Sequence, residues 1–355
     1  MTRVLFIGHD QGAAAMLLPV IRDMVADGEA IALAAAGPAA ALWDRLPAPV
    51  LSPDGDGEDW WGGYLDRLRP ELVVTGTGHY SDFERNCWRA ARNIGIRTVA
   101  VIDAWVNFAE RFERTADGAF VQPDAVCVID DDCRERLAAD SRFTGSVHVT
   151  GHPNLELLLS SATEAIRRRP PSSIPNLVFF SNPVLRQSQL RRPHFDQFRT
   201  ASVLVRALDA HGPLVLRVKP HPREDQEAWR RWAEAEPPPK DGCLELTSLP
   251  SADLLVMSDG VAGISSMALI EASLLGRPVL ALQFANDPDR LQNQAINAVP
   301  GITVVAEPAL AAAAAANLFR PPEATATLAN FHHCIEDACR RMRLAIESEM
   351  TRSQS

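Results

Sequence analysis

The fold is decided by residues 253–282, which read DLLVMSDGVAGISSMALIEASLLGRPVLAL. An apolar run of strand length at 254–257 leads into a turn, and a helix that begins near Ser265 and Ser266 follows. A Gly and a Pro end that helix before a second buried-strand run at 279–282. The stretch therefore predicts a βαβ unit whose helix N-terminus can bind a phosphate through free N–H groups and the helix dipole.

The same stretch has a plainer interpretation. Ser265 can be no more than the N-cap of an ordinary helix, and Glu271 can lie on its solvated face. The rest of the chain has to decide between these interpretations.

Short apolar runs alternate with segments of helical periodicity along the whole chain, which predicts parallel sheets with helices on both faces. The expected strands are residues 4–7, 30–34, 72–75, 98–102, 125–129, 147–150, 177–180, 214–218, 254–257, 279–282 and 302–305. The expected helices are residues 13–26, 37–46, 59–68, 82–94, 131–139, 196–210, 225–235, 264–275, 309–316 and 322–350.

A chain of 355 residues exceeds what one hydrophobic core usually serves, so we expect two domains. The first is a Rossmann-like domain over residues 1–160. A charged, proline-rich linker follows at 161–175, and a second Rossmann-like domain covers 176–320. A C-terminal helix occupies 321–355. Ligands of such open α/β sheets bind at the carboxyl ends of the strands, and we expect the two domains to face a shared cleft.

Composition excludes several classes of function. A net charge of −10 argues against a general nucleic-acid-binding protein. The six cysteines form no CxxC pair, which indicates neither a zinc site nor a disulfide framework and fits a reducing cytoplasm. We find no secretory signal and no apolar segment long enough to span a membrane. There is no P-loop and no GxGxxG pattern.

The loop RVKPHPR at 217–223 directly follows a predicted strand. A proline on either side of His221 restrains the backbone, so the imidazole is held at a strand end with Lys219 and Arg223 nearby. Such a group can donate a hydrogen bond to a phosphate oxygen and stabilise charge on a departing nucleotide. The alternative is a solvated, proline-rich surface loop.

The pattern KPHP, followed some forty residues later by a Ser pair and EASLLGRPV, resembles glycosyltransferases of the GT-B architecture. The resemblance is to bacterial sialyltransferases, Kdo-type capsule transferases and CDP-glycerol glycerophosphotransferases. It implies that His221 contacts the donor phosphate and that Ser265 and Ser266, with Gly263 just before them, bind phosphate oxygens. It also implies that Glu271 accepts hydrogen bonds from the ribose hydroxyls.

The EASLLGRPV run is also similar to that of UDP-N-acetylglucosamine 2-epimerases, which share this fold, and VTGHPN at 149–154 recurs in related form in the superfamily. The epimerases usually show S-G-G where this chain has Ser265, Ser266 and Met267. This departure favours a transferase over an epimerase.

The resemblance implies that the N-terminal domain binds the acceptor and supplies a base. His9 and Asp10, in the turn GHDQG after the first strand, are candidates because either can remove a proton from an acceptor hydroxyl. Any βα turn can contain Asp and Gly, which is the alternative. His79, in the turn TGTGH after the strand at 72–75, is a further polar residue at a strand end.

A third polar loop combines Asp103, Trp105, Asn107 and Arg111, which could form a sugar platform with hydrogen-bonding arms. Alternatively, Trp105 packs beneath the sheet. The acids at 130–132 open a helix and are expected to cap it, and no DxD pattern indicates a metal.

Together these features predict a metal-independent glycosyltransferase that needs no cofactor beyond its nucleotide-activated donor. It would move a sugar or polyol phosphate to a glycan, lipid-linked or small-molecule acceptor in the biosynthesis of cell-surface polysaccharide. Peripheral membrane contact is expected only if the acceptor is lipid-linked. Two alternatives stay open: a nucleotide-sugar 2-epimerase or hydrolase, and a non-catalytic nucleotide-sugar-binding subunit.

Overall fold

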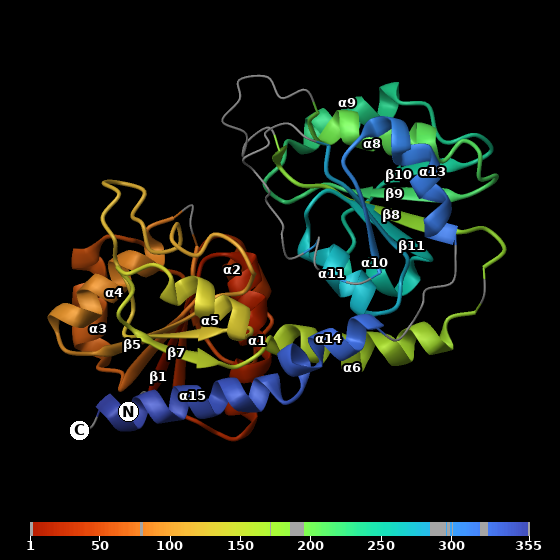
Figure 1. Cartoon of the computed structure of the whole chain (residues 1–355). Helices are drawn as coiled ribbons and strands as arrows, with labels where there is room; N and C mark the ends of the chain where they lie inside the picture. Colours follow the sequence, from red (N-terminus) through yellow and green to blue (C-terminus); the bar gives the residue numbers. More distant parts are fainter. Residues whose placement is uncertain are drawn as a thin grey trace. The chain divides into compact units, whose positions relative to one another are not determined.

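The computed structural model of the chain describes residues 3–78, 81–170, 172–184, 195–284, 296, 299, 301–319 and 326–353. Contacts divide it into two compact units. The first unit is Met1–Leu157 with His332–Ser355, and the second is Leu158–Phe331. Each unit is built on one parallel sheet flanked by helices, so the predicted α/β class with two Rossmann-like domains is confirmed (Figure 1).

The first unit has a seven-stranded sheet in the order β3-β2-β1-β4-β5-β6-β7. Its strands are β1 (Val4–Gly8), β2 (Ile31–Ala35), β3 (Val50–Leu51), β4 (Leu72–Thr75), β5 (Arg97–Val101), β6 (Ala125–Val128) and β7 (Ser146–Val149). Its helices are α1 (Gln11–Ala26), α2 (Gly37–Trp43), α3 (Glu58–Leu68), α4 (Phe83–Asn93), α5 (Asp131–Ala138) and α15 (Ala338–Ser353).

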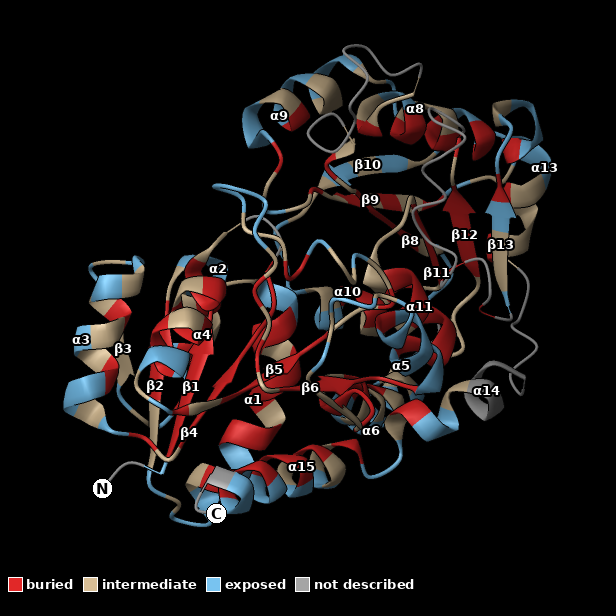
Figure 2. Ribbon diagram, turned by 60° about the vertical axis from the view of Figure 1, so that its left-hand side comes forward, coloured by how far each residue is buried: buried red, intermediate tan, exposed pale blue. Residues whose placement is uncertain are grey.

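Alternating side chains of the central strands bury on opposite faces of this sheet. Leu5, Ile7 and Val73 pack against Trp61 of α3 and Phe83 of α4. Helices α1 and α15 contact the sheet as well. Figure 2 shows the central strands buried while the outer faces of the helices stay exposed.

The second unit has a six-stranded sheet in the order β10-β9-β8-β11-β12-β13. Its strands are β8 (Asn176–Phe180), β9 (Val215–Lys219), β10 (Cys243–Leu246), β11 (Gly260–Gly263), β12 (Val279–Leu282) and β13 (Ile302–Val305). Its helices are α8 (Gln197–Ala207), α9 (Gln226–Ala235), α10 (Ser251–Met257), α11 (Met267–Leu274) and α13 (Ala311–Ala315), the last flanked by 3-10 turns.

The prediction of a strand at 254–257 is wrong. These residues form the end of helix α10, in which Leu254 and Leu255 are buried. The strand of this segment is β11, which follows the helix and consists of four Gly, Val and Ala residues. A Cβ on Gly263 would lie 2.7 Å from the carbonyl oxygen of Phe180 in the neighbouring strand β8. Small residues are therefore needed in β11. Because Gly and Ala do not form a run of large apolar residues, the sequence pattern does not predict this strand.

The prediction of a single helix at 322–350 is also wrong. Helix α14 (Ala326–Ile335) ends before Asp337, which has the left-handed φ of 53°, and α15 then begins. Helix α15 contacts β4, β5 and β6, so the end of the chain completes the first unit.

Two further differences concern the ends of elements. Strands β3 and β10 were not predicted, because each is a short edge strand. Helix α6 (Pro153–Arg168) runs through the first part of the expected linker 161–175, and the boundary between the units falls within it. Within the described ranges, no helix has the length and apolar character needed to cross a membrane.

Candidate functional site

In each sheet the strand order reverses direction at one point, and loops that leave the sheet there diverge to form a ligand-binding crevice. In the first unit this switch point lies between β1 and β4, and in the second between β8 and β11. Most of the predicted site residues lie in loops at or next to these two points. Each switch point is described separately below.

The β1–α1 loop contains Asp10, and at the start of α1 Gly12 allows the carboxylate of Asp103 to approach the backbone closely. A Cβ on Gly12 would lie 2.0 Å from Asp103 Oδ2, so only glycine fits there. Asp10 is the N-cap residue of α1 but makes no side-chain cap hydrogen bond. The His9 ring packs against Phe83, with centroids 5.6 Å apart. The structure thus brings Asp10 and Asp103 to the same helix N-terminus, which favours negative charge.

Glu84, in the first turn of α4, lies at this switch point and was missed by the sequence analysis. Its side chain is 1% exposed. A side chain at Gly78 would meet Asp10 Oδ2 at 2.9 Å and Glu84 Oε2 at 3.6 Å, so both carboxylates face the same glycine turn. Among the residues that the structure describes, neither oxygen of Glu84 has a partner at hydrogen-bond distance and angle.

The environment of Glu84 makes its carboxyl hard to ionise. Burial raises its pKa to about 7, and the negative charge of Asp10 contributes in the same direction, while backbone N–H groups of Glu84 and His9 and the charge of Arg85 oppose the shift. A carboxyl whose pKa is near neutrality can both accept and return a proton at physiological pH.

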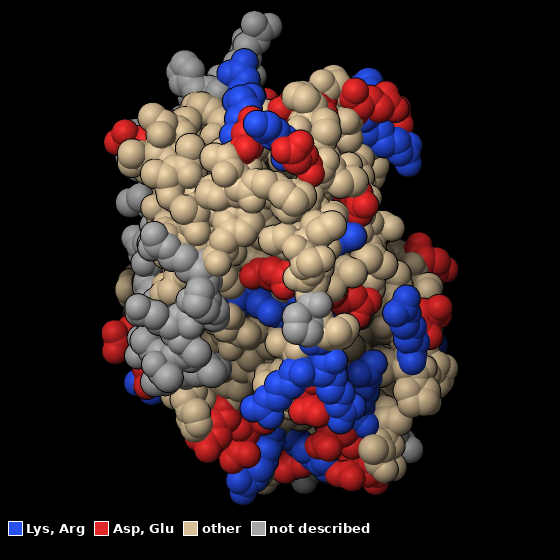
Figure 3. Space-filling view, turned by 90° about the vertical axis from the view of Figure 1, so that its right-hand side faces the viewer, with Lys and Arg blue, Asp and Glu red and all other residues tan. Residues whose placement is uncertain are grey.

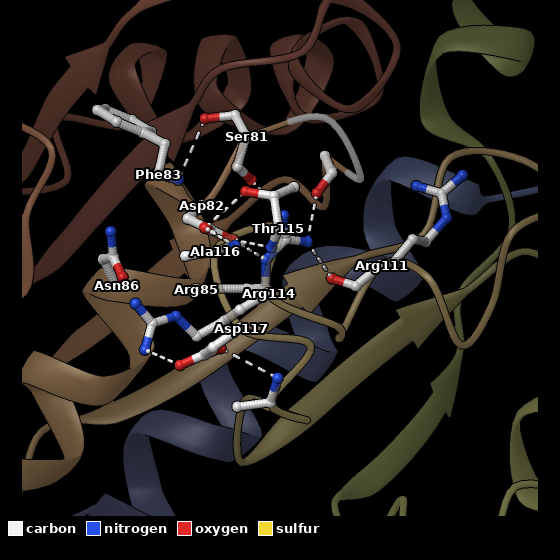
Figure 4. A network of polar contacts seen from close by, with 12 residues as sticks. Ser81, Asp82, Phe83, Arg85, Asn86, Arg111, Arg114, Thr115, Ala116 and Asp117 are labelled. Carbon is white, nitrogen blue, oxygen red and sulfur yellow. Dashed lines mark hydrogen bonds and ion pairs between the residues drawn. The ribbon is translucent and has the colours of Figure 1, made fainter. Parts of the chain in front are cut away.

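A polar network fixes the backbone around this carboxyl (Figure 4). Arg85 is buried and donates to the carbonyl oxygens of Gly78, at 2.7 Å, and Arg111, at 2.8 Å. It also donates to Asp82 Oδ1 at 2.8 Å. Burial acts to raise the pKa of Asp82, but hydrogen bonds from Thr115 and Arg85 hold it below its usual value. The network links the glycine turn to the loop at 111–117.

The predicted sugar platform at 103–111 is only partly exposed. Trp105 is 6% exposed, and its indole N–H donates to Asp130, which favours the alternative of a packed ring over a sugar-stacking face. Arg111 is 5% exposed and donates to Asp103 Oδ1 and to Thr77 Oγ1, both at 2.8 Å. Asn107 is exposed, with a φ of 59°. Asp103 and Arg111 therefore form a braced ion pair beside the switch point.

His152, from the GHPN sequence, joins this cluster. Its imidazole is 5% exposed, and burial lowers its pKa while the nearby Asp103 opposes that shift. The ring Nδ1 accepts from the backbone N–H of Leu155 at 3.3 Å. His79 lies outside the described residues.

In the second unit, the loop after β9 is held by Glu224. This buried carboxylate accepts from the backbone N–H of His221 at 2.6 Å and from Ser181 Oγ at 2.8 Å. His221 Nδ1 accepts from the backbone N–H of Arg223 at 3.1 Å, which leaves Nε2 as the donor. The prolines and Glu224 together fix the imidazole at the end of the strand.

The loop after β8 connects the two predicted motifs. Ser181 contacts Glu224 in the His221 loop, while Asn182 Oδ1 accepts from the backbone N–H of Ser265 at 3.0 Å. Because β8 lies between β9 and β11, three neighbouring loops meet at this edge. The structure thus brings His221 and Ser265 to one edge through two residues that the sequence analysis missed.

The remaining predicted residues of this unit differ in their roles. Ser266 is the N-cap of α11, and its Oγ accepts from the backbone N–H of Ala268 at 3.3 Å. Burial raises the pKa of Glu271 to about 7. Lys219 Nζ donates to the carbonyl oxygen of Leu249 at 2.7 Å, and partial burial lowers its pKa. Gly263 is required by strand packing, as described above.

Sequence signals for the missed residues exist. Ser181 and Asn182 directly follow a predicted strand, as SNP, which is where ligand contacts concentrate in such sheets. Glu84 and Glu224 carried no such signal, because acids near helix starts are usually solvated.

On the face drawn in Figure 3, Lys and Arg side chains lie among Asp and Glu side chains and do not form a patch of one sign.

No protein-family model and no curated protein sequence matches the chain. Its structure is similar to that of UDP-GlcNAc 2-epimerase from Neisseria meningitidis bound to UDP-GlcNAc, with a TM-score of 0.66, 13% identity, and coverage of 99% of this chain and 100% of that one. It is similar to MurG of Acinetobacter baumannii, with a TM-score of 0.59, 12% identity and coverage of 98% and 100%.

A third similar structure is the glycotransferase of kitacinnamycin, with a TM-score of 0.61, 15% identity and coverage of 98% of both chains. These likenesses extend over nearly the full length of each chain, so the chain shares the two-domain GT-B-like fold of epimerases and glycosyltransferases.

Proposed function

We propose that the protein is an enzyme that acts on a nucleotide-activated sugar or polyol phosphate, and that it transfers this group to an acceptor hydroxyl. The observation that carries the proposal is Glu84, a fully buried carboxyl whose pKa burial raises to about 7 and which faces Asp10 across a glycine turn at the first switch point. A binding subunit has no need of such a group, because burying a carboxyl costs stability.

In this proposal the second unit supplies the phosphate contacts. His221 donates from Nε2 to a phosphate oxygen and stabilises the charge on the leaving nucleotide, and the N-terminus of α11 near Ser265 and Ser266 binds the same group. Support comes from the orientation of the imidazole by Glu224 and Arg223 and from the meeting of three loops at one edge.

The first unit supplies the base. The proton of the acceptor hydroxyl passes to the carboxylate of Glu84, whose pKa burial and, to a lesser extent, the charge of Asp10 hold near neutrality. The ion pair of Asp103 with Arg111 positions the acceptor. Attack by the acceptor oxygen forms the new bond as the bond to the nucleotide phosphate breaks, and His221 balances the charge that develops there.

A second candidate function is a nucleotide-sugar 2-epimerase or hydrolase. It is favoured by the likeness to UDP-GlcNAc 2-epimerases, two of which were solved with UDP-GlcNAc. Glu84 suits this chemistry too, because abstraction of a proton from a sugar carbon also needs a buried base.

The test begins with a thermal-shift panel of CMP, CDP, UDP, GDP and dTDP, since a ligand that binds only the folded chain raises its melting temperature. The preferred nucleotide then selects activated donors, incubated with and without acceptor glycans. Transfer that requires an acceptor supports the main proposal, and a new epimer or free nucleotide without acceptor supports the second. Binding without turnover of any donor would contradict both.

A further inference from the structure

The C-terminal segment brings a second cluster of reactive side chains to the first unit. One ligand atom each from Asp130, His333 and Cys334 lies within 4.8 Å of the others. Cys334 Sγ is 3.2 Å from His333 Nε2 and 3.7 Å from Asp130 Oδ2. Asp130 and Cys334 are buried while His333 is exposed, so the cluster opens to solvent on the side of the imidazole.

The two spacings from Cys334 Sγ, to His333 Nε2 and to Asp130 Oδ2, are close to those of a tetrahedral metal site. With bonds of about 2.3 Å to sulfur and about 2.0–2.1 Å to nitrogen or oxygen, neighbouring ligand atoms around Zn²⁺ are roughly 3.5 Å apart. A thiolate, an imidazole and a carboxylate form a donor set of the kind that zinc takes. A divalent ion could therefore bind with little movement of the three side chains.

The surroundings of the cluster hold these ligands in place, as outer partners do in metal sites. Asp130 Oδ1 accepts from the backbone N–H of Cys133 at 2.8 Å, and Oδ2 accepts from the indole of Trp105. The carbonyl oxygen of Cys334 accepts from the backbone N–H of His152 at 2.7 Å. The carboxylate and the end of α14 are thus fixed independently of any ion.

The charges in the cluster suit a dication. The carboxylate and a thiolate together carry two negative charges. Arg341 is a neighbouring cation, but its guanidinium donates to the carbonyl oxygen of His333 at 2.7 Å. Cys334 would lose its thiol proton to solvent as the ion bound.

We propose that Asp130, His333 and Cys334 bind a zinc-type divalent ion, with water as the fourth ligand on the exposed side. The ion would join the end of α14 to the loop between β6 and α5. It would also tighten the position of Asp130, which supports Trp105 and through it the loop that carries Asp103. This site is independent of the function proposed above.

The test uses the full-length chain, stripped with a chelator and titrated with Co²⁺ and then Zn²⁺. We expect a single ion per chain, a thiolate-to-cobalt charge-transfer band, visible absorption typical of tetrahedral Co²⁺, and a rise in melting temperature with Zn²⁺.

Cys334→Ser should abolish the charge-transfer band, and His333→Ala should weaken Zn²⁺ binding by about tenfold or more. His333 is exposed, so its variant is expected to fold even if Cys334→Ser does not. The control is Cys243→Ser, which removes an exposed thiol elsewhere and should change nothing. A wild-type chain that binds neither metal, or variants that bind as well as it does, would overturn the proposal in favour of a hydrogen-bonded cluster.

Discussion

The switch points of the two sheets have the same topology and opposite chemistry. In the first unit the loops bring together the carboxyls of Asp10, Glu84 and Asp103. In the second they bring together the imidazole of His221, the amide of Asn182 and the N-terminus of α11. In the proposed function, the first edge accepts a proton and the second binds an anion. The residues of the loops, and not the topology of the sheet, therefore determine the chemistry of each edge.

The two units also share one feature, a glutamate whose pKa burial raises to about 7. Burial raises the pKa of both Glu84 and Glu271, but only Glu84 also has a nearby negative charge, that of Asp10. Similar pKa values thus have different origins in the two units, and the predictions below separate them.

The largest effect is expected for Glu84→Gln, which keeps the shape of the side chain and removes the base. Turnover should fall about 10²–10⁴-fold, the usual contribution of general acid–base catalysis, with nucleotide affinity retained. Steady-state kinetics and nucleotide titration measure both. Glu135→Gln, on the exposed face of α5, is the matched control. A variant with normal turnover would break the assignment of the base to the first unit.

The next effect concerns the anion-binding edge. His221→Ala should lower turnover roughly 10²–10³-fold, as expected when a donor to the developing charge is lost, while the melting temperature stays close to that of the wild type. Binding of a nucleoside diphosphate should weaken more than that of the nucleoside. Arg231→Ala, at an exposed position of α9, serves as the control. Equal weakening for both ligands would remove the phosphate role of His221.

The third prediction concerns stability and pH. Unfolded glutamate loses its proton near pH 4.5, whereas folded Glu84 keeps it to about pH 7, so between these values the unfolded chain binds fewer protons. The free energy of unfolding should therefore decline as pH rises through this window, by on the order of 3 kcal/mol for this group. Glu84→Gln should remove this share of the decline and leave the share of Glu271, whose pKa burial also raises to about 7. Denaturant unfolding at several pH values measures it.

A further variant, Asp10→Asn, tests whether the raised pKa values of Glu84 and Glu271 have different causes. It should lower the pKa of Glu84 and leave that of Glu271 unchanged, as followed by carbon-13 NMR of the side-chain carboxyls. A shift at both residues, or at neither, would contradict the account of their separate origins.

The smallest effect separates the two adjacent serines. Ser266 caps α11, so Ser266→Ala should reduce the free energy of unfolding by about 1 kcal/mol. Ser265→Ala removes a hydroxyl from the proposed phosphate site and should weaken nucleotide binding by about fivefold, for one lost hydrogen bond. Both variants are measured by thermal melts and nucleotide titration, and each variant is the control for the other. The reverse pattern would exchange their roles.

Much of this arrangement follows from local patterns. The His221 loop was predicted because strand periodicity ends where a proline-flanked imidazole begins, and chemistry at strand ends is a property of all such sheets. The strand β11 was missed because close packing against Phe180 demands glycine, which carries no apolar signal. The sequence left two interpretations of Trp105 open, because burial of its ring depends on Asp130, which lies 25 residues further along the chain.

The sequence by itself determined the alternation of strands and helices, the two-domain α/β class and the loop that carries His221, because each depends on periodicity or on neighbouring residues. Only the tertiary structure decided that Glu84 is buried opposite Asp10, that Ser181 and Asn182 join the two motifs of the second unit, and that the C-terminus returns to the first. These depend on contacts between residues far apart in the chain, and a pKa is set by everything that surrounds the group.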